Sequence, residues 1–390
     1  MRKKFTWLSL SLAVAILTAS PSTLAIVPLQ PVSPSSTQEA TDSLGFDEQL
    51  WGSLEQPGDR EALLTSIDNS LRYLNTAAAV RAYQQYPVRG VTLDRVRRSL
   101  IRFRELLLTT NSPAELQAAI NREFVFYKSV GNDGQGTVYF TGYFEPIYAA
   151  SRTPSAEYPY PIYRRPANFE SWQNPHPTRA QLEGADGTGL NSPLRGQELF
   201  WFRDRFEAFL VHIQGSAQLQ LPDGNIVTIG YAGSTDYPYN SVGRELAKDG
   251  RLPLDGMTLP VMSDYFHKNP DLMSQYLPRN KRFIFFDETY GRPATGSLQV
   301  PVTAERSIAT DKSLMPPGAL ALINAPVPFP NANGELEYRK VSRYVLDQDT
   351  GSAIKGAGRV DYFIGTGPVA GVRAGSIGGR GELYYPLLKN

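Results

Sequence analysis

The sequence predicts a mainly β protein with peripheral helices, and three observations support this fold class. The 390 residues include 21 Tyr and 18 Phe, and both residue types are enriched in strands. The 33 Gly and 30 Pro imply many turns, which favours short strands over long helices. Hydrophobic residues make up 41% and charged residues 20% of the chain, as in an ordinary folded protein that is long enough for two domains.

The N-terminus has the pattern of an export signal. Basic residues at 2–4 precede an apolar run over 7–19, and Ala25 ends a cleavage site of small residues. The apolar run is too short to span a bilayer comfortably, so we expect a signal peptide over 1–25, with an uncleaved anchor as the alternative. The Pro- and Ser-rich residues 26–45 are expected to form a flexible linker.

Composition also excludes several classes of site. The chain has no Cys, so disulfides, a thiol nucleophile and a lipid anchor through Cys are excluded. A formal net charge of +1 gives no indication of a nucleic-acid partner. We expect no metal, because the three histidines lack metal-ligand spacing. We also expect no cofactor, because no helix pattern follows the Gly-rich stretch 365–371, as a dinucleotide site would require.

Helices are predicted mainly near the start of the folded region. Apolar residues at three- and four-residue steps predict helices over 59–74 and 92–110. A capping box that begins at Ser112, with Pro113 in the first turn, predicts a further helix to about 124. Shorter helices are expected over 241–249 and 258–277, the second one ended by Pro278.

Strand patterns begin near residue 137. Aromatic and β-branched residues over 137–146 predict a strand that Pro146 ends, and the aromatic pattern continues over 158–163. Residues 218–231 form a hairpin pattern around the Asp223-Gly224 turn. Strands are then expected from 281 to the C-terminus.

The candidate chemistry lies in aspartates near predicted strand ends. Asp349 and Asp361 flank a turn that contains Lys355 and several glycines, and Asp311 precedes another turn. Two neighbouring carboxylates, one of them partly desolvated, would give one carboxyl a raised pKa and so a general acid at neutral pH. A solvated Asp- and Gly-rich hairpin turn is the alternative interpretation. The abundant aromatic side chains would suit the flat faces of sugar rings, although most of them are expected to fill the core.

Eight separated motifs resemble one known family, membrane-bound lytic murein transglycosylase A, whose C-terminal part is a three-aspartate (3D) domain. They lie in the same order as in that family, at 158–164, 209–216, 231–233, 307–311, 316–318, 349–356, 359–361 and 367–375. The resemblance extends from about residue 138 to the C-terminus. It implies a double-psi β-barrel made from 46–145 and 286–390, a second β-domain inserted over 146–285, and a substrate groove between the two.

The resemblance also implies residue roles. Asp361 would be the single catalytic acid and base, Asp349 the carboxylate that supports it, and Asp311 the first aspartate of the 3D motif. The expected groove residues are Thr141, Tyr143, Gln214, Gly215, Ser216, Tyr231, Ala232, Gly233, Lys355 and Gly356. The expected substrate is the glycan strand of peptidoglycan, cleaved between N-acetylmuramic acid and N-acetylglucosamine with formation of a 1,6-anhydromuramyl end.

The sequence leaves two other functions open, as well as the exact cellular location. An ordinary peptidoglycan hydrolase would use a second carboxylate to activate water, and a non-catalytic wall-binding module would keep the groove without needing Asp361. We expect an exported monomer in the periplasm or cell envelope. The outer membrane is the candidate surface, although the family's lipid-anchoring cysteine is missing.

Overall fold

A computed structural model of the chain describes residues 27–32, 44–52 and 57–389. The expected signal peptide and much of the expected linker lie outside these residues. Within the linker span, Leu29–Pro31 forms strand β1, which pairs antiparallel with β2 (Phe124–Ser129). Leu29 is fully buried. These three residues are therefore part of the sheet and not of a free tether, because the burial of Leu29 and the ladder hydrogen bonds hold them there.

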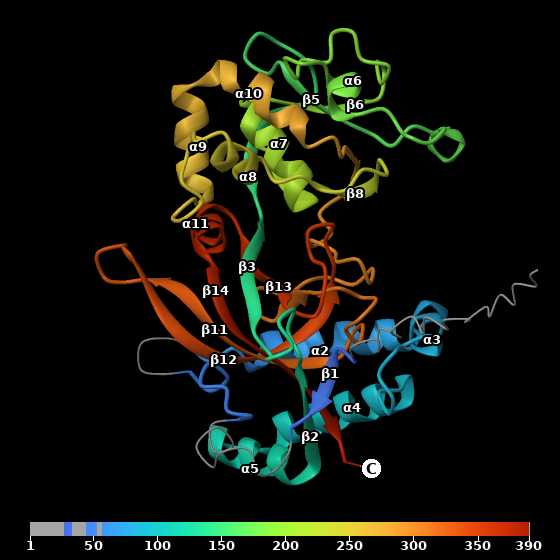
Figure 1. The fold of residues 1–390 in the computed structure, drawn as a ribbon, viewed down its shortest axis with the longest axis vertical. Coiled ribbons are helices and arrows are strands. Elements are labelled where there is room, and N and C mark those ends of the chain that lie inside the picture. The colour runs from blue at the N-terminus through green and yellow to red at the C-terminus, as the bar shows by residue number, and fades with distance from the viewer. Residues whose placement is uncertain (1–26, 33–43, 53–56, 390) are drawn as a thin grey trace, which may run out of the picture.

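The lower body in Figure 1 is a closed six-stranded barrel. Its strands are, in spatial order, β14 (Gly378–Leu388), β11 (Leu320–Pro330), β12 (Leu336–Asp349), β10 (Ser307–Ala309), β13 (Arg359–Thr366) and β3 (Val138–Glu145). The ring closes because β3 pairs with both β13 and β14. The β10–β12 and β13–β3 pairs are parallel and the others are antiparallel. The structure thus confirms the expected β-barrel class.

A second sheet is inserted between β3 and β10 of the barrel. Its order is β5 (Tyr160–Tyr163), β6 (Glu198–Phe202), β4 (Ile147–Ser151), β7 (Ser216–Gln220), β8 (Ile226–Ser234) and β9 (Ile284–Glu288). The helices of this part are α6 (Arg179–Glu183), α7 (Arg205–Gln214), α8 (Val242–Lys248), α9 (Leu259–Lys268) and α10 (Pro270–Tyr276), with 3₁₀ turns at Phe169–Ser171 and Leu277–Arg279. Figure 1 shows this inserted part stacked on the barrel, with β3 rising from one into the other.

Helices α2 (Arg60–Leu74), α3 (Ala77–Gln84), α4 (Leu93–Thr109) and α5 (Pro113–Glu123) lie against the other side of the barrel, as Figure 1 shows. The predicted apolar stripes face inward, and Leu63, Leu100 and Phe103 are fully buried. The Ser112 hydroxyl caps α5 by accepting the backbone N–H of Glu115. These helices close the barrel on the side away from the inserted part.

The helix predictions are wrong in two places. The helix expected over 258–277 is two helices, because Pro270 cannot donate the backbone hydrogen bond that a continuous helix would need at that point. At the C-terminal end, Pro368–Ser376 forms α11, where only strands were expected. Pro368 stands in the first turn of α11, where its missing N–H costs nothing, and Ala370 and Ala374 pack inward.

Buried charges fasten the N-terminal segment to the barrel. The Arg306 guanidinium is fully buried and donates to Asp47 (2.5 Å), to Asp59 (2.8 Å) and to the carbonyl oxygen of Tyr344 (2.7 Å). The Asp47 carboxylate also accepts the backbone N–H of Tyr344. Asp47 is itself almost fully buried, and Arg306 is its nearest counter-charge, with the buried Arg343 guanidinium farther away at 3.7 Å.

Replacing Arg306 by Met should therefore destabilise the protein strongly. Loss of Arg306 leaves the buried Asp47 carboxylate with only the longer ion pair to Arg343, and breaking a buried pair costs about 3–5 kcal/mol in the free energy of unfolding. The matched control is Arg98→Met, because Arg98 forms an exposed ion pair with Asp94 on α4 and should leave the denaturation midpoint close to that of the unmodified protein. Urea titration of both variants would measure this. Equal midpoints would show that the Arg306 cluster does not hold the N-terminal segment in place.

Candidate functional site

A groove with a volume of about 860 Å³ lies between the barrel and the inserted part. The inserted part contributes residues 212–216, 229–231, 236–239 and parts of β9, and the barrel contributes Tyr143, Glu145, the loop 292–302, 349–352, Lys355 and Phe363. Residues far apart in the sequence therefore meet in one cavity. This is the position that the sequence predicted for the substrate groove.

The parallel pairing of β13 with β3 sets a ladder of side chains that begins at the groove, where Phe363 and Tyr143 line it. Phe363 pairs with Tyr143, Asp361 with Thr141, and Arg359 with Tyr139. Successive side chains on one face of a strand are two residues apart. Asp361 therefore lies on the same face of β13 as the groove-lining Phe363 and is its neighbour there. The Phe363 and Tyr143 rings lie 5.1 Å apart.

Asp361 is partly exposed and belongs to a short hydrogen-bonded relay. The Thr141 hydroxyl donates to Asp361 Oδ1 (2.7 Å) and accepts from Arg359 Nη2 (2.9 Å). The pKa of the Asp361 carboxyl is raised to about 6, chiefly by burial and to a smaller extent by the negative charge of Asp349, while the Thr141 hydrogen bond and the Arg359 charge oppose the rise. Asp361 is therefore a carboxyl that changes protonation state near neutral pH.

Asp349 is held rigidly at the end of β12. Its Oδ1 accepts the backbone N–H groups of Ser297 (2.8 Å) and Thr350 (2.8 Å). Burial raises the pKa of Asp349, although these two hydrogen bonds lower it. The buried Tyr143 hydroxyl lies beside Asp349 at a geometry too poor for a regular hydrogen bond. The Tyr143 hydroxyl thus lies within electrostatic reach of both Asp349 and Asp361. Its own pKa is raised well above its usual value by burial and by these two charges.

Asp311 occupies a different kind of environment. Its Oδ1 accepts the Ser313 hydroxyl (2.7 Å) and backbone N–H (3.1 Å), and its Oδ2 accepts the backbone N–H of Gly356 (2.9 Å). Burial tends to raise the pKa of Asp311, but the hydrogen bonds and the charge of Lys355 outweigh it, so the pKa is lowered. Asp311 is therefore a carboxylate whose lowered pKa favours the ionised form, and it joins two loops.

The structure brings most of the other predicted residues to the groove. The lining includes Tyr143, Gln214, Gly215, Ser216, Tyr231 and Lys355. Four of the ten predicted groove residues do not line it: Thr141, Ala232, Gly233 and Gly356, and the lining does not include Asp361 either. Ala232 and Gly233 follow Tyr231, where the β8–β9 register shifts, and Gly356 is half-buried with a φ of +85°. A Cβ at Gly356 would approach Asn132 Oδ1 to 2.4 Å, so this position needs glycine.

The sequence reasoning missed many residues of the groove lining, and two of them matter most for its geometry and charge. Glu145 is buried at the end of β3, and its Oε2 accepts Gln218 Nε2 (3.0 Å) from the inserted part and the Thr366 hydroxyl (2.9 Å) from the barrel. Tyr239 lines the groove from the inserted part and is close enough to Asp361 for that charge to raise its pKa, after burial. Only the position of Glu145 directly before Pro146 marked it as a strand end.

Within residues 27–32, 44–52 and 57–389, three or more His, Asp or Glu side chains do not gather in a way that could hold a metal ion. The described helices include none that is long and apolar enough to cross a membrane.

Comparison with known proteins adds sequence relatives and solved folds. Residues 139–287 match the MltA specific insert domain, and residues 306–387 match the 3D domain. Membrane-bound lytic murein transglycosylase A of Vibrio cholerae is 32% identical over 264 residues, which is 67% of this chain and 68% of the relative. The protein of the same name from Escherichia coli K12 is 30% identical over 63% of this chain and 64% of the relative.

Solved structures agree with these sequence relatives. A membrane-bound lytic murein transglycosylase from Agrobacterium tumefaciens superposes with a TM-score of 0.66 and 26% identity over 85% of this chain and 93% of that one. Escherichia coli MltA with bound chitohexaose shares the fold, with a TM-score of 0.67 and 23% identity over 93% of this chain and 95% of that one. The chain therefore belongs to the membrane-bound lytic murein transglycosylase A family of enzymes.

Proposed function

We propose that this enzyme is a lytic transglycosylase that cleaves the β-1,4 bond between N-acetylmuramic acid and N-acetylglucosamine in peptidoglycan, with Asp361 as its single acid and base. Family membership supports the substrate class and the type of reaction. The observation that carries the residue assignment is the Asp361 carboxyl itself, partly exposed beside the groove, with a pKa raised to about 6. Such a carboxyl can both donate and accept a proton near neutral pH.

The proposed reaction needs one proton and no water. Protonated Asp361 donates its proton to the glycosidic oxygen, the bond from that oxygen to C1 of the muramyl residue breaks, and the N-acetylglucosamine leaves with a free hydroxyl. The muramyl C1 passes through an oxocarbenium-like state. The muramyl C6 oxygen then bonds to C1 while its proton passes to the Asp361 carboxylate, which restores the enzyme and forms the 1,6-anhydro ring.

The other two aspartates would have supporting roles. We assign Asp349 as the charge that adds to the raised pKa of Asp361, after burial, and that stabilises the positive charge developing on the sugar. Asp311 would position the loop that carries Lys355 and Gly356, because its carboxylate is already occupied by backbone and hydroxyl donors. The hydrolase alternative would instead require one of these carboxylates to activate a water molecule.

We further propose that the protein is exported, works as a monomer and meets its substrate in the periplasm or cell envelope. The export pattern at 1–25 and the relatives' name, membrane-bound, support an envelope location. The absence of Cys means that any attachment to the outer membrane would not use a lipid on Cys.

Asp361→Asn should reduce the release of anhydro-muropeptides from peptidoglycan by about 10²–10⁴-fold, because the amide cannot donate the proton. Mass spectrometry of the soluble products would measure it. The matched control is Asp264→Asn, since Asp264 is an exposed residue on α9 that does not line the groove, and this variant should keep its activity. Anhydro products at an undiminished rate from Asp361→Asn would exclude Asp361 as the acid. Products that carry reducing ends, heavier by one water, would favour the hydrolase, and no products from the unmodified protein would favour a wall-binding module.

The rate of anhydro-muropeptide release should fall as the pH rises through about 6. The pKa of Asp361 is raised to about 6, so the carboxyl is protonated below that pH and loses the proton that it must donate above it. The Thr141 hydroxyl stabilises the ionised form, so Thr141→Val should raise this pKa further and shift the midpoint of the rate profile to higher pH. Thr141→Ser keeps the hydroxyl and should stay near the unmodified profile. A midpoint that moves down in Thr141→Val would contradict the assignment.

A further inference from the structure

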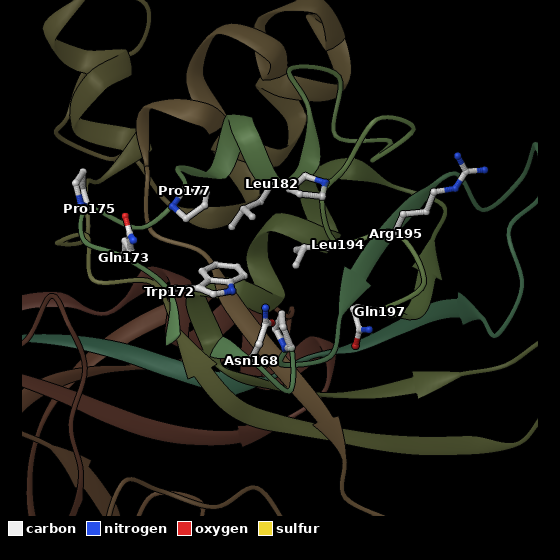
Figure 2. Close-up of a pocket in the computed structure, with 11 residues that line it drawn as sticks. Asn168, Trp172, Gln173, Pro175, Pro177, Leu182, Leu194, Arg195 and Gln197 are labelled. Atoms are coloured by element: carbon white, nitrogen blue, oxygen red, sulfur yellow. The ribbon is translucent and has the colours of Figure 1, made fainter. Parts of the chain in front are cut away.

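A second cavity, with a volume of about 540 Å³, opens on the inserted part away from the groove. Its lining consists of Pro166, Asn168, Trp172, Gln173, Pro175, Pro177, Leu182, Pro193, Leu194, Arg195 and Gln197. None of these residues lines the groove. Figure 2 shows the Trp172 ring near the centre of the cavity, with Leu182 and Leu194 beside it and Arg195 extending outward at the rim.

Trp172 is fixed from behind by other rings. It packs against Phe169 (centroids 5.1 Å apart), Phe285 (5.9 Å) and His176 (5.8 Å). Phe169 and Phe285 are buried, whereas Trp172 remains partly exposed. The ring therefore offers a rigid flat surface whose orientation is set before any ligand arrives.

The polar side chains around Trp172 are free to bind. Among the described residues, the side chains of Asn168, Gln173, Arg195 and Gln197 find no hydrogen-bond or ion-pair partner, and neither does the Trp172 indole N–H. No carboxylate lines the cavity. The cavity thus combines one aromatic face, three amides and one cation.

We propose that this cavity is a second, non-catalytic binding site for a peptidoglycan glycan strand, an inference that rests on the proposed function. An aromatic face packs on the apolar face of a pyranose ring, and amide side chains can pair with sugar hydroxyl and acetamido groups. Arg195 complements the carboxylates that muramyl residues and their peptides carry. The lack of a lining carboxylate fits the same anionic polymer, because no like charge would oppose it.

One shared wall separates the cavity from the groove. Behind Trp172, the His176 carbonyl oxygen accepts the Tyr237 hydroxyl (2.7 Å), and His176 Nδ1 accepts the backbone N–H of Asp236 (3.2 Å). Asp236 and Tyr237 line the groove. A glycan strand bound at Trp172 would therefore hold insoluble peptidoglycan next to the groove and keep the enzyme on the polymer between cleavage events.

The test compares binding to insoluble peptidoglycan in an inactive background. Asp361→Asn and the double variant Asp361→Asn/Trp172→Ala would be sedimented with purified peptidoglycan, and the second is expected to bind about 5- to 10-fold more weakly. Because Trp172 packs against core rings, Arg195→Ala/Gln197→Ala in the same background provides a variant that leaves the packing intact, and it should weaken binding in the same direction. Tyr338→Ala, on the β11–β12 hairpin, is the control and should bind like Asp361→Asn.

Two further readouts separate this proposal from the proposed function. In the active protein, Trp172→Ala should release products from short soluble glycan fragments at an unchanged rate but from insoluble peptidoglycan several-fold more slowly. Equal binding by all the inactive variants would overturn the second site, even if the product analysis supports the transglycosylase. The second site would also be overturned if a proline-rich peptide, and not chitohexaose, quenches the fluorescence that Trp172→Ala removes, since the cavity would then be a peptide site.

Discussion

The parallel pairing of β13 with β3 is the constraint on which the rest of the structure depends. It places Thr141 opposite Asp361, two residues that are 220 positions apart in the chain. Parallel neighbours cannot be joined by a tight turn, so the chain between them must travel a long way. That connection contains the whole inserted part as well as the barrel strands β10, β11 and β12. The pairing therefore forms the relay around Asp361 and also sets the place from which the inserted part rises.

The end of β3 transmits this geometry to the groove. Directly after Glu145 the chain leaves the barrel and enters β4, and the Glu145 carboxylate is hydrogen-bonded both to Gln218 on one side and to Thr366 on the other. The backbone N–H of Phe144 is also bonded to the Gln214 side chain. These bonds are made by buried or half-buried groups, which hold a fixed geometry better than exposed pairs do. The two walls of the groove are thus fastened at its base, and Tyr239 of the inserted part is held within electrostatic reach of Asp361.

Much of this fold could be predicted from local patterns. Apolar spacing located α2 and α4, the Ser112 capping box located α5, and the Asp-Gly turn located the β7–β8 hairpin. Local patterns failed where tertiary contacts decide. The short strand at Leu29 exists because β2 is there to pair with it, and α11 forms in a Gly-rich stretch because its small residues let it pack closely on the barrel: a Cβ at Gly371 would approach the Phe144 ring to 2.7 Å.

The same limit applies to the candidate site. Asp349 and Asp361 could be proposed from their positions around one turn, and the groove residues from the family resemblance. Periodicity could not indicate that Arg359 orients the Thr141 hydroxyl toward Asp361, because that contact joins two strands that are neighbours in the barrel but far apart in the sequence. It also could not separate Asp311, whose oxygens are all engaged by donors, from Asp361, which has one donor and a raised pKa.

In the proposed reaction, this difference between Asp311 and Asp361 is decisive. Burial alone would keep the Asp361 carboxyl protonated and would oppose its ionisation. A carboxylate whose oxygens all accept hydrogen bonds, such as Asp311, resists protonation instead. The relay from Arg359 through Thr141 offsets part of the burial effect, which leaves a group able to give up a proton and then take one back.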